Sequence, residues 1–195
     1  MTIRFLKPIT APSAEPITLA EAKLHARVEA SADDTLITAL ITAGREEAEH
    51  ITGRALMTQT WEQVLDAFSD TMELGLAPVS SITSIKYLDS NGAEQTLAST
   101  VYDLIDEAFT PRVVLKTGQS WPATYSADDA VRIRFVAGYG GTGSDVPAAI
   151  RAWMQVRVAS LYAQREAVIA GVSVAEMPGR FTAGLLDPYR IPRAG

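Results

Sequence analysis

The sequence predicts an α+β fold: a helical bundle of two N-terminal helices and one long C-terminal helix, with an inserted antiparallel β unit and an extended C-terminal arm. Three observations lead to this prediction. Apolar residues recur at helical spacing between residues 33 and 53, and they do so again after Pro147. Between these stretches, short runs of β-forming residues are separated by turn signals, and no helix-length pattern falls among them.

The N-terminal part is predicted to be an arm followed by two helices. Residues 1–16 contain three prolines and are expected to form an extended N-terminal arm. Residues 17–56 supply the first two helices of the bundle. Thr18 and Glu21 fit a capping box, in which each side chain accepts a hydrogen bond from the other residue's backbone, so a short helix is expected to begin there. The second helix is expected to end at Gly53, because glycine adopts the left-handed conformation that commonly closes a helix.

Residues 57–144 are predicted to form the antiparallel β insertion. Asn91 and Gly92 mark a tight hairpin, because this pair tolerates the positive φ angles that such turns need. The strand candidates are Thr58–Leu65, Ile82–Leu88, Val101–Ile105, Arg112–Lys116 and Ala130–Ala137.

The C-terminal part is predicted to be one helix followed by an arm. Residues 145–171 supply the third helix of the bundle, which is expected to begin at Pro147, because the missing N–H of a proline costs nothing in the first turn. Trp153 and Tyr162 are expected to lie in the core or at a subunit interface. Glycines and prolines interrupt the pattern beyond, so residues 172–195 are expected to form an extended docking arm.

The composition excludes several classes of protein. No cysteine is present, which excludes disulfides, thiolate catalysis and Cys-ligated zinc. No stretch of the sequence has the length and apolar character of a signal peptide or a membrane span. We therefore expect a protein made in the cytoplasm that has no membrane partner.

The net charge of −6 is distributed unevenly along the chain. Residues 1–145 carry 11 basic and 20 acidic side chains, a balance of −9, whereas residues 146–195 carry six arginines and three acidic residues, a balance of +3. An acidic body repels polyphosphates, which argues against a general nucleic-acid binder. The basic C-terminal part suits an acidic partner surface, although arginines on a solvated helix face would give the same count.

A glycine-rich loop is the strongest candidate for a ligand site. Gly138, Gly140, Gly141 and Gly143 lie between a predicted strand and a predicted helix, in the pattern of a dinucleotide-binding loop. Such a site also needs a parallel sheet that continues after the helix and an acidic residue that holds the ribose, and the remaining sequence offers neither. We interpret these glycines as a hinge and keep a nucleotide-dependent enzyme as the least favoured alternative.

No catalytic, cofactor or metal site is predicted. Glu47 and His50 have the spacing of two di-iron ligands on one helix face, but the second such motif that a di-iron centre requires is missing from the sequence. No nucleophile motif is present either. The protein is therefore not expected to be an enzyme.

Short motifs follow one another along nearly the whole chain. In order they are Pro16–Lys23, Asp33–Ile37, Ile51–Leu56, Thr58–Trp61, Pro78-Val79, Tyr87–Asp89 with Asn91-Gly92, Trp121-Pro122, Ala137–Gly140, Val146-Pro147, Leu161-Tyr162 with Arg165-Glu166, and Leu185–Arg190. In their order and spacing they resemble the head–tail connector, or portal adaptor, proteins of tailed phages, a family with members in gene transfer agents and prophages.

This resemblance implies a virion structural protein that forms a ring, usually a dodecamer, between the capsid portal and the tail. Its implied partners are the portal protein, the next tail component (a stopper or tail terminator), other copies of the chain, and the double-stranded DNA that passes transiently through the central channel. An acidic wall suits such a channel because it does not hold phosphates. Assembly in the bacterial cytoplasm into a virion or phage-like particle is implied as well. A tail-side connector or completion protein that binds the tail tube is the alternative.

The last of these motifs, Leu185–Arg190, supplies the predicted portal contacts. Leu185, Leu186 and Tyr189 are expected to be apolar anchors and Arg190 a charged contact, since Tyr and Arg often dominate binding at interfaces. The alternative is that Leu185 and Leu186 fold back on the protein's own core. Deleting residues 184–195 is expected to leave the fold intact and to abolish portal binding.

Overall fold

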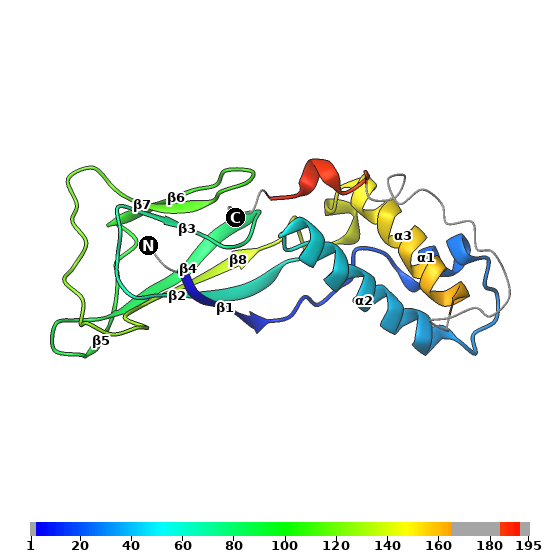
Figure 1. Cartoon of the computed structure of the whole chain (residues 1–195), viewed down its shortest axis with the longest axis horizontal. Coiled ribbons are helices and arrows are strands. Elements are labelled where there is room, and N and C mark those ends of the chain that lie inside the picture. The colour runs from blue at the N-terminus through cyan, green and yellow to red at the C-terminus, as the bar shows by residue number, and fades with distance from the viewer. Residues whose placement is uncertain (1–2, 165–183, 192–195) are drawn as a thin grey trace, which may run out of the picture. The chain divides into compact units, whose positions relative to one another are not determined.

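The structure, a computed structural model, describes residues 3–164 and 184–191 (Figure 1). It combines helices with antiparallel sheets, so the predicted α+β class is confirmed. The chain divides into two compact units. The first, which we call the β unit, consists of Met1–Ser13, Gly53–Tyr139 and Ile191–Gly195; the second, the helical unit, consists of Ala14–Thr52 and Gly140–Arg190. The chain therefore passes from one unit to the other at more than one point in the sequence.

Two antiparallel sheets make up the β unit. The first has five strands in the order β1 (Ile3–Thr10), β2 (Gln59–Leu65), β8 (Val131–Ala137), β4 (Val79–Leu88) and β5 (Glu94–Thr96). The second has three strands in the order β3 (Thr71–Glu73), β7 (Arg112–Leu115) and β6 (Tyr102–Ile105). All pairs between these strands are antiparallel, as predicted.

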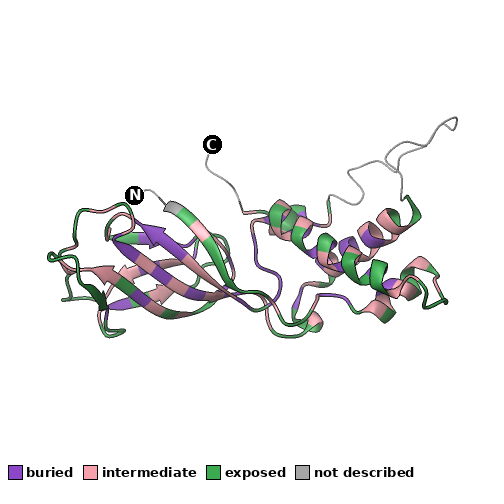
Figure 2. Cartoon of the chain, turned by 90° about the horizontal axis from the view of Figure 1, so that it is seen from below, coloured by how far each residue is buried: buried purple, intermediate pink, exposed green. Residues whose placement is uncertain are grey.

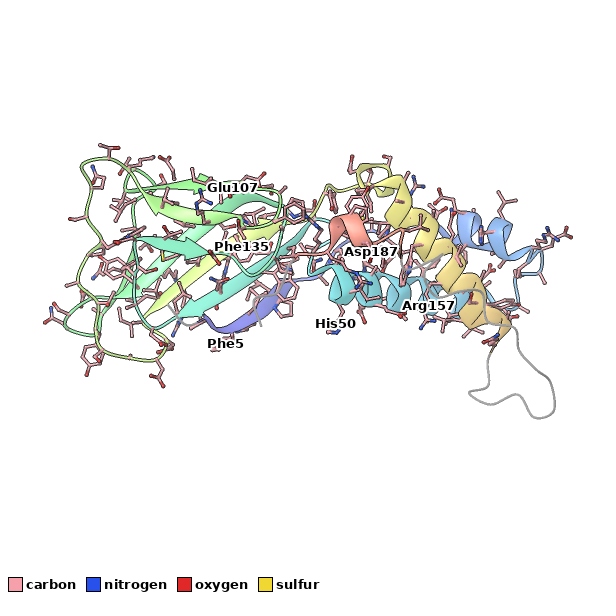
Figure 3. All side chains as sticks on the ribbon, turned by 45° about the horizontal axis from the view of Figure 1, so that its top comes forward. Phe5, His50, Glu107, Phe135, Arg157 and Asp187 are labelled. Carbon is pink, nitrogen blue, oxygen red and sulfur yellow. The ribbon has the colours of Figure 1, made fainter. Side chains whose placement is uncertain are left out.

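The two sheets enclose one hydrophobic core. Strand β8 alternates between buried and half-buried residues along its whole length, as expected of a strand with one face on a core. The alternation is visible as bands of colour on the strands in Figure 2. Phe135 of β8, labelled in Figure 3, is fully buried in a cluster that also contains Met72 of β3 and Val113 of β7. Residues of both sheets therefore share this core.

The first residues of the chain differ from the prediction. The segment expected to be an extended arm contains β1, which pairs with β2 in a register that includes Lys7 opposite Glu62. Its prolines obscured the strand pattern in the sequence. Pro8 is nevertheless compatible with the position of β1 at the edge of the sheet, where a missing N–H need not remove a ladder hydrogen bond.

The predicted hairpin is confirmed. Strands β4 and β5 pair on either side of a turn in which Gly92 has a φ of 80°. The Asp89 carboxylate closes this turn by accepting hydrogen bonds from the backbone N–H groups of Asn91 and Ala93, at 2.9 and 3.1 Å. A hydrogen bond from the Gln95 side chain, followed by these two backbone bonds, lowers the pKa of Asp89.

Three helices form the helical unit: α1 (Leu19–Ala26), α2 (Asp34–Thr52) and α3 (Ala148–Ala163). Each of them contacts the other two. The capping box at the start of α1 is confirmed, since the Thr18 N–H donates to Glu21 Oε2 at 2.7 Å and the Glu21 N–H donates to Thr18 Oγ1 at 3.2 Å. The C-terminal helix, predicted to begin at Pro147, begins at Ala148 with Pro147 as its N-cap, and the residues predicted to continue it beyond Gln164 lie outside the described part of the chain.

Candidate functional site: the C-terminal segment and the glycine loop

The C-terminal segment is an ordered turn rather than an extended chain. Residues 184–186 form a turn that leads into the short 3₁₀ helix η2 (Asp187–Tyr189). Pro188 suits this position because its fixed φ matches the start of a helical turn. The Tyr189 N–H donates to the Leu186 carbonyl at 2.9 Å and the Arg190 N–H to the Asp187 carbonyl at 3.3 Å. The segment thus presents its side chains from a defined backbone.

The four predicted contact residues of this segment differ in exposure. Leu186 is fully buried, with 0% of its surface accessible. Leu185 and Tyr189 are half-buried, and Arg190 is exposed. For Leu186, the structure therefore shows the alternative in which the side chain packs on the protein's own residues. Leu185, Tyr189 and Arg190 retain surface that a partner can reach.

Arg190 forms an ion pair within its own turn. Its Nε lies 3.2 Å from Asp187 Oδ1, and the two side chains are 47% and 62% exposed. Figure 3 labels Asp187 on this turn. Ion pairs with this much solvent contact contribute little to stability. A partner carboxylate can therefore replace Asp187 at little cost.

Ile191, which follows this turn, was not singled out from the sequence. It belongs to the β unit, where it lies over Gly53. A Cβ added to Gly53, whose φ is 71°, would come within 3.5 Å of the Ile191 side chain. A single isoleucine that is followed directly by Pro192 carries no periodic signal. The contact with Gly53 is therefore visible only in the folded chain.

The glycine loop lies where the chain passes from Tyr139 of the β unit to Gly140 of the helical unit. Gly138, with a φ of 128°, packs so closely that a Cβ there would clash with the backbone carbonyl of Met57. Gly143 is packed against the carbonyl of Pro16, whereas Gly141 faces open space. Close packing against backbone thus accounts for two of the four glycines.

An acidic side chain fills the position at which a phosphate would have to lie. A Cβ on Gly140 would overlap the Asp145 carboxylate, which accepts hydrogen bonds from the Thr142 N–H and hydroxyl, each at 2.9 Å. The backbone N–H of Thr142, followed by its hydroxyl, holds the pKa of Asp145 below its ordinary value. A carboxylate that takes the loop's donors repels phosphate, so the loop is a poor nucleotide site.

The residues that the structure describes contain neither a metal-binding cluster nor a membrane-spanning helix. Glu47 pairs with Arg157 of α3, whose Nε lies 2.7 Å from Glu47 Oε2, and Figure 3 labels Arg157 and His50 on their helices. Among the described residues, no group of three or more His, Asp or Glu side chains could hold a metal ion. No helix in this part of the chain is long and apolar enough to cross a membrane.

Trp153 and Tyr162 occupy different environments on α3. Trp153 is only 6% exposed and belongs to the core. Tyr162 is half-buried, and its hydroxyl donates to Asp33 Oδ2 at 2.6 Å. Both residues therefore have partners within the chain.

Comparison with known proteins tests the predicted family. Residues 16–101 match the family model described as "Phage gp6-like head-tail connector protein". The predicted resemblance to the head–tail connector family is confirmed. The family is a structural one, and the match supports the role of a virion connector. No curated protein matches the chain.

Solved structures extend the likeness over almost the whole chain. A chain from the "neck of empty GTA particle computed with C6 symmetry" is 23% identical, with a TM-score of 0.81. A chain from the "virion of native gene transfer agent (GTA) particle" is 24% identical, with a TM-score of 0.80. A third, from the "neck of native GTA particle computed with C12 symmetry", is 25% identical, with a TM-score of 0.74. Each match covers 98% of this chain and 97% of the other. The likeness of fold to these neck and virion chains thus extends over both the β unit and the helical unit.

Proposed function

We propose that this protein is the connector that forms a ring between the capsid portal and the tail of a virion or phage-like particle, without catalytic activity. The main support is the match of 98% of this chain, at 25% identity, to a chain in the neck of a native GTA particle. The separate match of residues 16–101 to the head–tail connector family agrees with it. That neck was computed with C12 symmetry, which supports a dodecamer. Assembly takes place in the bacterial cytoplasm.

The exposed part of the C-terminal segment is the proposed portal contact. Leu185, Tyr189 and Arg190 contact the portal, and Leu186 anchors the segment to its own chain. Support comes from the solvent-exposed pair of Arg190 with Asp187, which a partner carboxylate can take over. Tyr and Arg are also the residue types that most often dominate an interface.

The glycine loop is the proposed hinge. Gly138 and Gly140 flank the point at which the chain passes between the two units, and Gly141 has open space around it. Gly138 and Gly143 are packed against backbone and Gly140 against the Asp145 carboxylate, so the proposed movement centres on Gly141. The other side of the ring meets the next tail component, a stopper or tail terminator.

Double-stranded DNA passes through the central channel of the ring. The net charge of −6 supports this role, because a surface that repels phosphate does not retain a moving duplex. Binding to free DNA is therefore expected to be weak at physiological salt concentration.

A pull-down with immobilised portal protein from the same gene cluster tests the proposed contact. Arg190→Ala combined with Tyr189→Ala should reduce capture of the protein at least tenfold, since each hot-spot truncation costs on the order of 2 kcal/mol. The matched control is Leu24→Ala, a truncation of an apolar residue that is 82% exposed on α1. Capture of the double variant at the wild-type level would refute the contact, and capture by a tail component alone would favour the tail-side alternative.

A further inference from the structure

The 3₁₀ helix η2 is too short to persist on its own. It spans three residues. One backbone hydrogen bond joins the Tyr189 N–H to the Leu186 carbonyl, and a second joins the Arg190 N–H to the Asp187 carbonyl. A first helical turn fixes several backbone angles in return for very few hydrogen bonds, so it is unstable in isolation. The solvent-exposed pair of Arg190 with Asp187 adds little. Residues that flank the turn must therefore keep it formed.

Leu186 holds the chain where it enters the turn. Its side chain is fully buried, whereas Asp187, the next residue, is exposed. Movement of the backbone at this point would return the leucine side chain to water, which is unfavourable. Pro188 narrows the conformations of the turn further, because its ring fixes φ. The start of η2 is thus determined by a buried anchor and a stiff backbone.

Ile191 holds the chain where it leaves the turn. The side chain is half-buried, and its Cβ, Cδ1 and Cγ1 lie 3.5, 3.8 and 3.9 Å from the position that a Cβ on Gly53 would take. Gly53 directly follows Thr52, the last residue of α2, and has a φ of 71°, which disfavours other residues. Ile191 therefore rests on bare glycine backbone at a defined point of the chain.

We propose that Leu186 and Ile191 are positioning residues for the portal contact: they hold η2 in the conformation that the portal binds, and neither touches the portal. The inference rests on the proposed contact through the exposed side chains of this segment. A segment that is ordered before binding loses little freedom on binding. When only a fraction of the chains has the ordered turn, the apparent dissociation constant rises in inverse proportion to that fraction. Portal affinity then depends on residues outside the contact.

Binding kinetics distinguish positioning from contact. Ile191→Ala removes most of the side chain over Gly53 and leaves the proposed contact residues in place. On immobilised portal protein from the same gene cluster, we expect its initial binding rate to fall about tenfold, because fewer chains have the ordered turn. The dissociation rate should change less than twofold, since the contacts themselves are intact. Tyr189→Ala, in contrast, should mainly raise the dissociation rate, as is usual for residues that touch a partner.

Two further variants control for a general effect on the fold. Ile191→Val keeps a branched side chain over Gly53 and should restore most of the initial binding rate. Ile9→Ala is the same truncation at an isoleucine that is 36% exposed on β1, and it should leave both rates unchanged. An unchanged initial rate for Ile191→Ala would overturn the proposal. A raised dissociation rate with an unchanged initial rate would overturn it as well, because Ile191 would then touch the portal.

Hydrogen exchange in the free protein tests the ordering of the turn without the portal. The N–H groups of Tyr189 and Arg190 should exchange about fivefold or more slowly in the wild type than in Ile191→Ala, because both are hydrogen-bonded within the turn. Mass spectrometry of a peptide that covers residues 184–191 measures this difference.

The two experiments separate failure of the positioning role from failure of the proposed function. If the wild-type chain binds the portal and exchange is equally fast in Ile191→Ala and the wild type, the positioning role is wrong and the proposed function stands. If the wild-type chain does not bind the portal, the proposed contact fails, and the role of Leu186 and Ile191 in it fails too.

Discussion

The hydroxyl of Tyr162, in the last turn of α3, donates a hydrogen bond of 2.6 Å to the carboxylate of Asp33, just before α2 begins. Asp33 lies in the turn between α1 and α2, so this bond ties the end of α3 to the other two helices. At the other end of α3, Arg151 donates to the Pro16 carbonyl at 3.1 Å and also pairs with Glu21. The helical unit is thus held by polar contacts at both ends of α3 as well as by its core.

Removal of the Tyr162 hydroxyl should weaken this unit. We expect Tyr162→Phe to lower the free energy of unfolding by about 1–2 kcal/mol, because a hydrogen bond to a charged acceptor is lost and the carboxylate keeps its partly buried position. Urea unfolding followed by the helical circular dichroism signal measures the change. The control is Tyr125→Phe in the β unit, which should leave this transition unchanged; equal effects of the two substitutions would contradict the assignment.

The Glu21 carboxylate gives the helical unit a predictable pH dependence. Hydrogen bonds from Thr18, first from its backbone, hold the pKa of Glu21 below its ordinary value of 4.5, and Arg151 lowers it further. A carboxyl group whose pKa is lower in the folded state than in the unfolded state stabilises the fold at pH values above its unfolded-state pKa. This stabilisation is lost as the pH falls through its folded-state pKa.

Glu21→Gln should therefore melt at a lower temperature than the wild type at pH 7, and the two melting temperatures should converge as the pH falls below 4.5. Melting curves at several pH values provide the test. Glu46→Gln, a change at a largely exposed side chain of α2, is the control. A difference between Glu21→Gln and the wild type that stays constant down to the lowest pH would mean that ionisation of Glu21 contributes nothing.

Burial of Leu186 changes the expected result of a C-terminal truncation. The sequence predicted that loss of residues 184–195 leaves the fold intact, but a side chain that is 0% exposed contributes to the stability of the chain. Leu186→Ala should lower the free energy of unfolding by about 2–4 kcal/mol, the range for a fully buried leucine. Leu24→Ala, at a position that is 82% exposed, should cost less than about 0.5 kcal/mol. Denaturant unfolding of the two variants separates these outcomes, and equal stability would show that Leu186 is not an anchor.

Gly138 should tolerate no side chain. Gly138→Ala places a methyl group against the Met57 carbonyl at a φ of 128°, so we expect a loss of about 2–3 kcal/mol or failure to fold. Gly141→Ala, where a Cβ meets nothing within 4 Å, should be close to neutral. Thermal melting of the pair tests the difference, and an unchanged melting temperature for Gly138→Ala would contradict the close packing.

Nucleotides should not stabilise the protein. A ligand at 100 times its dissociation constant adds about 2.7 kcal/mol to the free energy of unfolding. Because the Asp145 carboxylate accepts from the N–H and hydroxyl of Thr142 and places a negative charge in the glycine loop, we expect no change in melting temperature with a panel of mono- and dinucleotides. Stabilisation by a dinucleotide that disappears in Gly141→Val would revive the enzyme alternative.

The sequence predicted those parts of the fold that depend on local chemistry. The capping box of Thr18 and Glu21 and the hairpin at Gly92 each need only neighbouring residues, and both are present in the structure. The core strand β8 was equally visible from its alternating pattern. Strand β1 was not, because its partner residues in β2 lie fifty or more positions away in the sequence and Pro8 masks the strand pattern.

The candidate site shows the same division. Leu185, Tyr189 and Arg190 are predicted as contacts from their residue types and from the family resemblance, whereas the burial of Leu186 depends on tertiary packing. The position of Ile191 over Gly53 is also a tertiary contact. Neither contact could be predicted from the sequence, because a segment of only a few residues is too short to show a periodic pattern of apolar residues.

The central claim is that this chain forms a ring on the portal. Light scattering combined with negative-stain imaging of the purified protein, alone and mixed with the portal from its own gene cluster, tests that claim most directly. We predict a large ring-shaped complex in the mixture, with a mass consistent with twelve copies of the chain on one portal. A protein that remains a monomer of 20.9 kDa with and without the portal would contradict it.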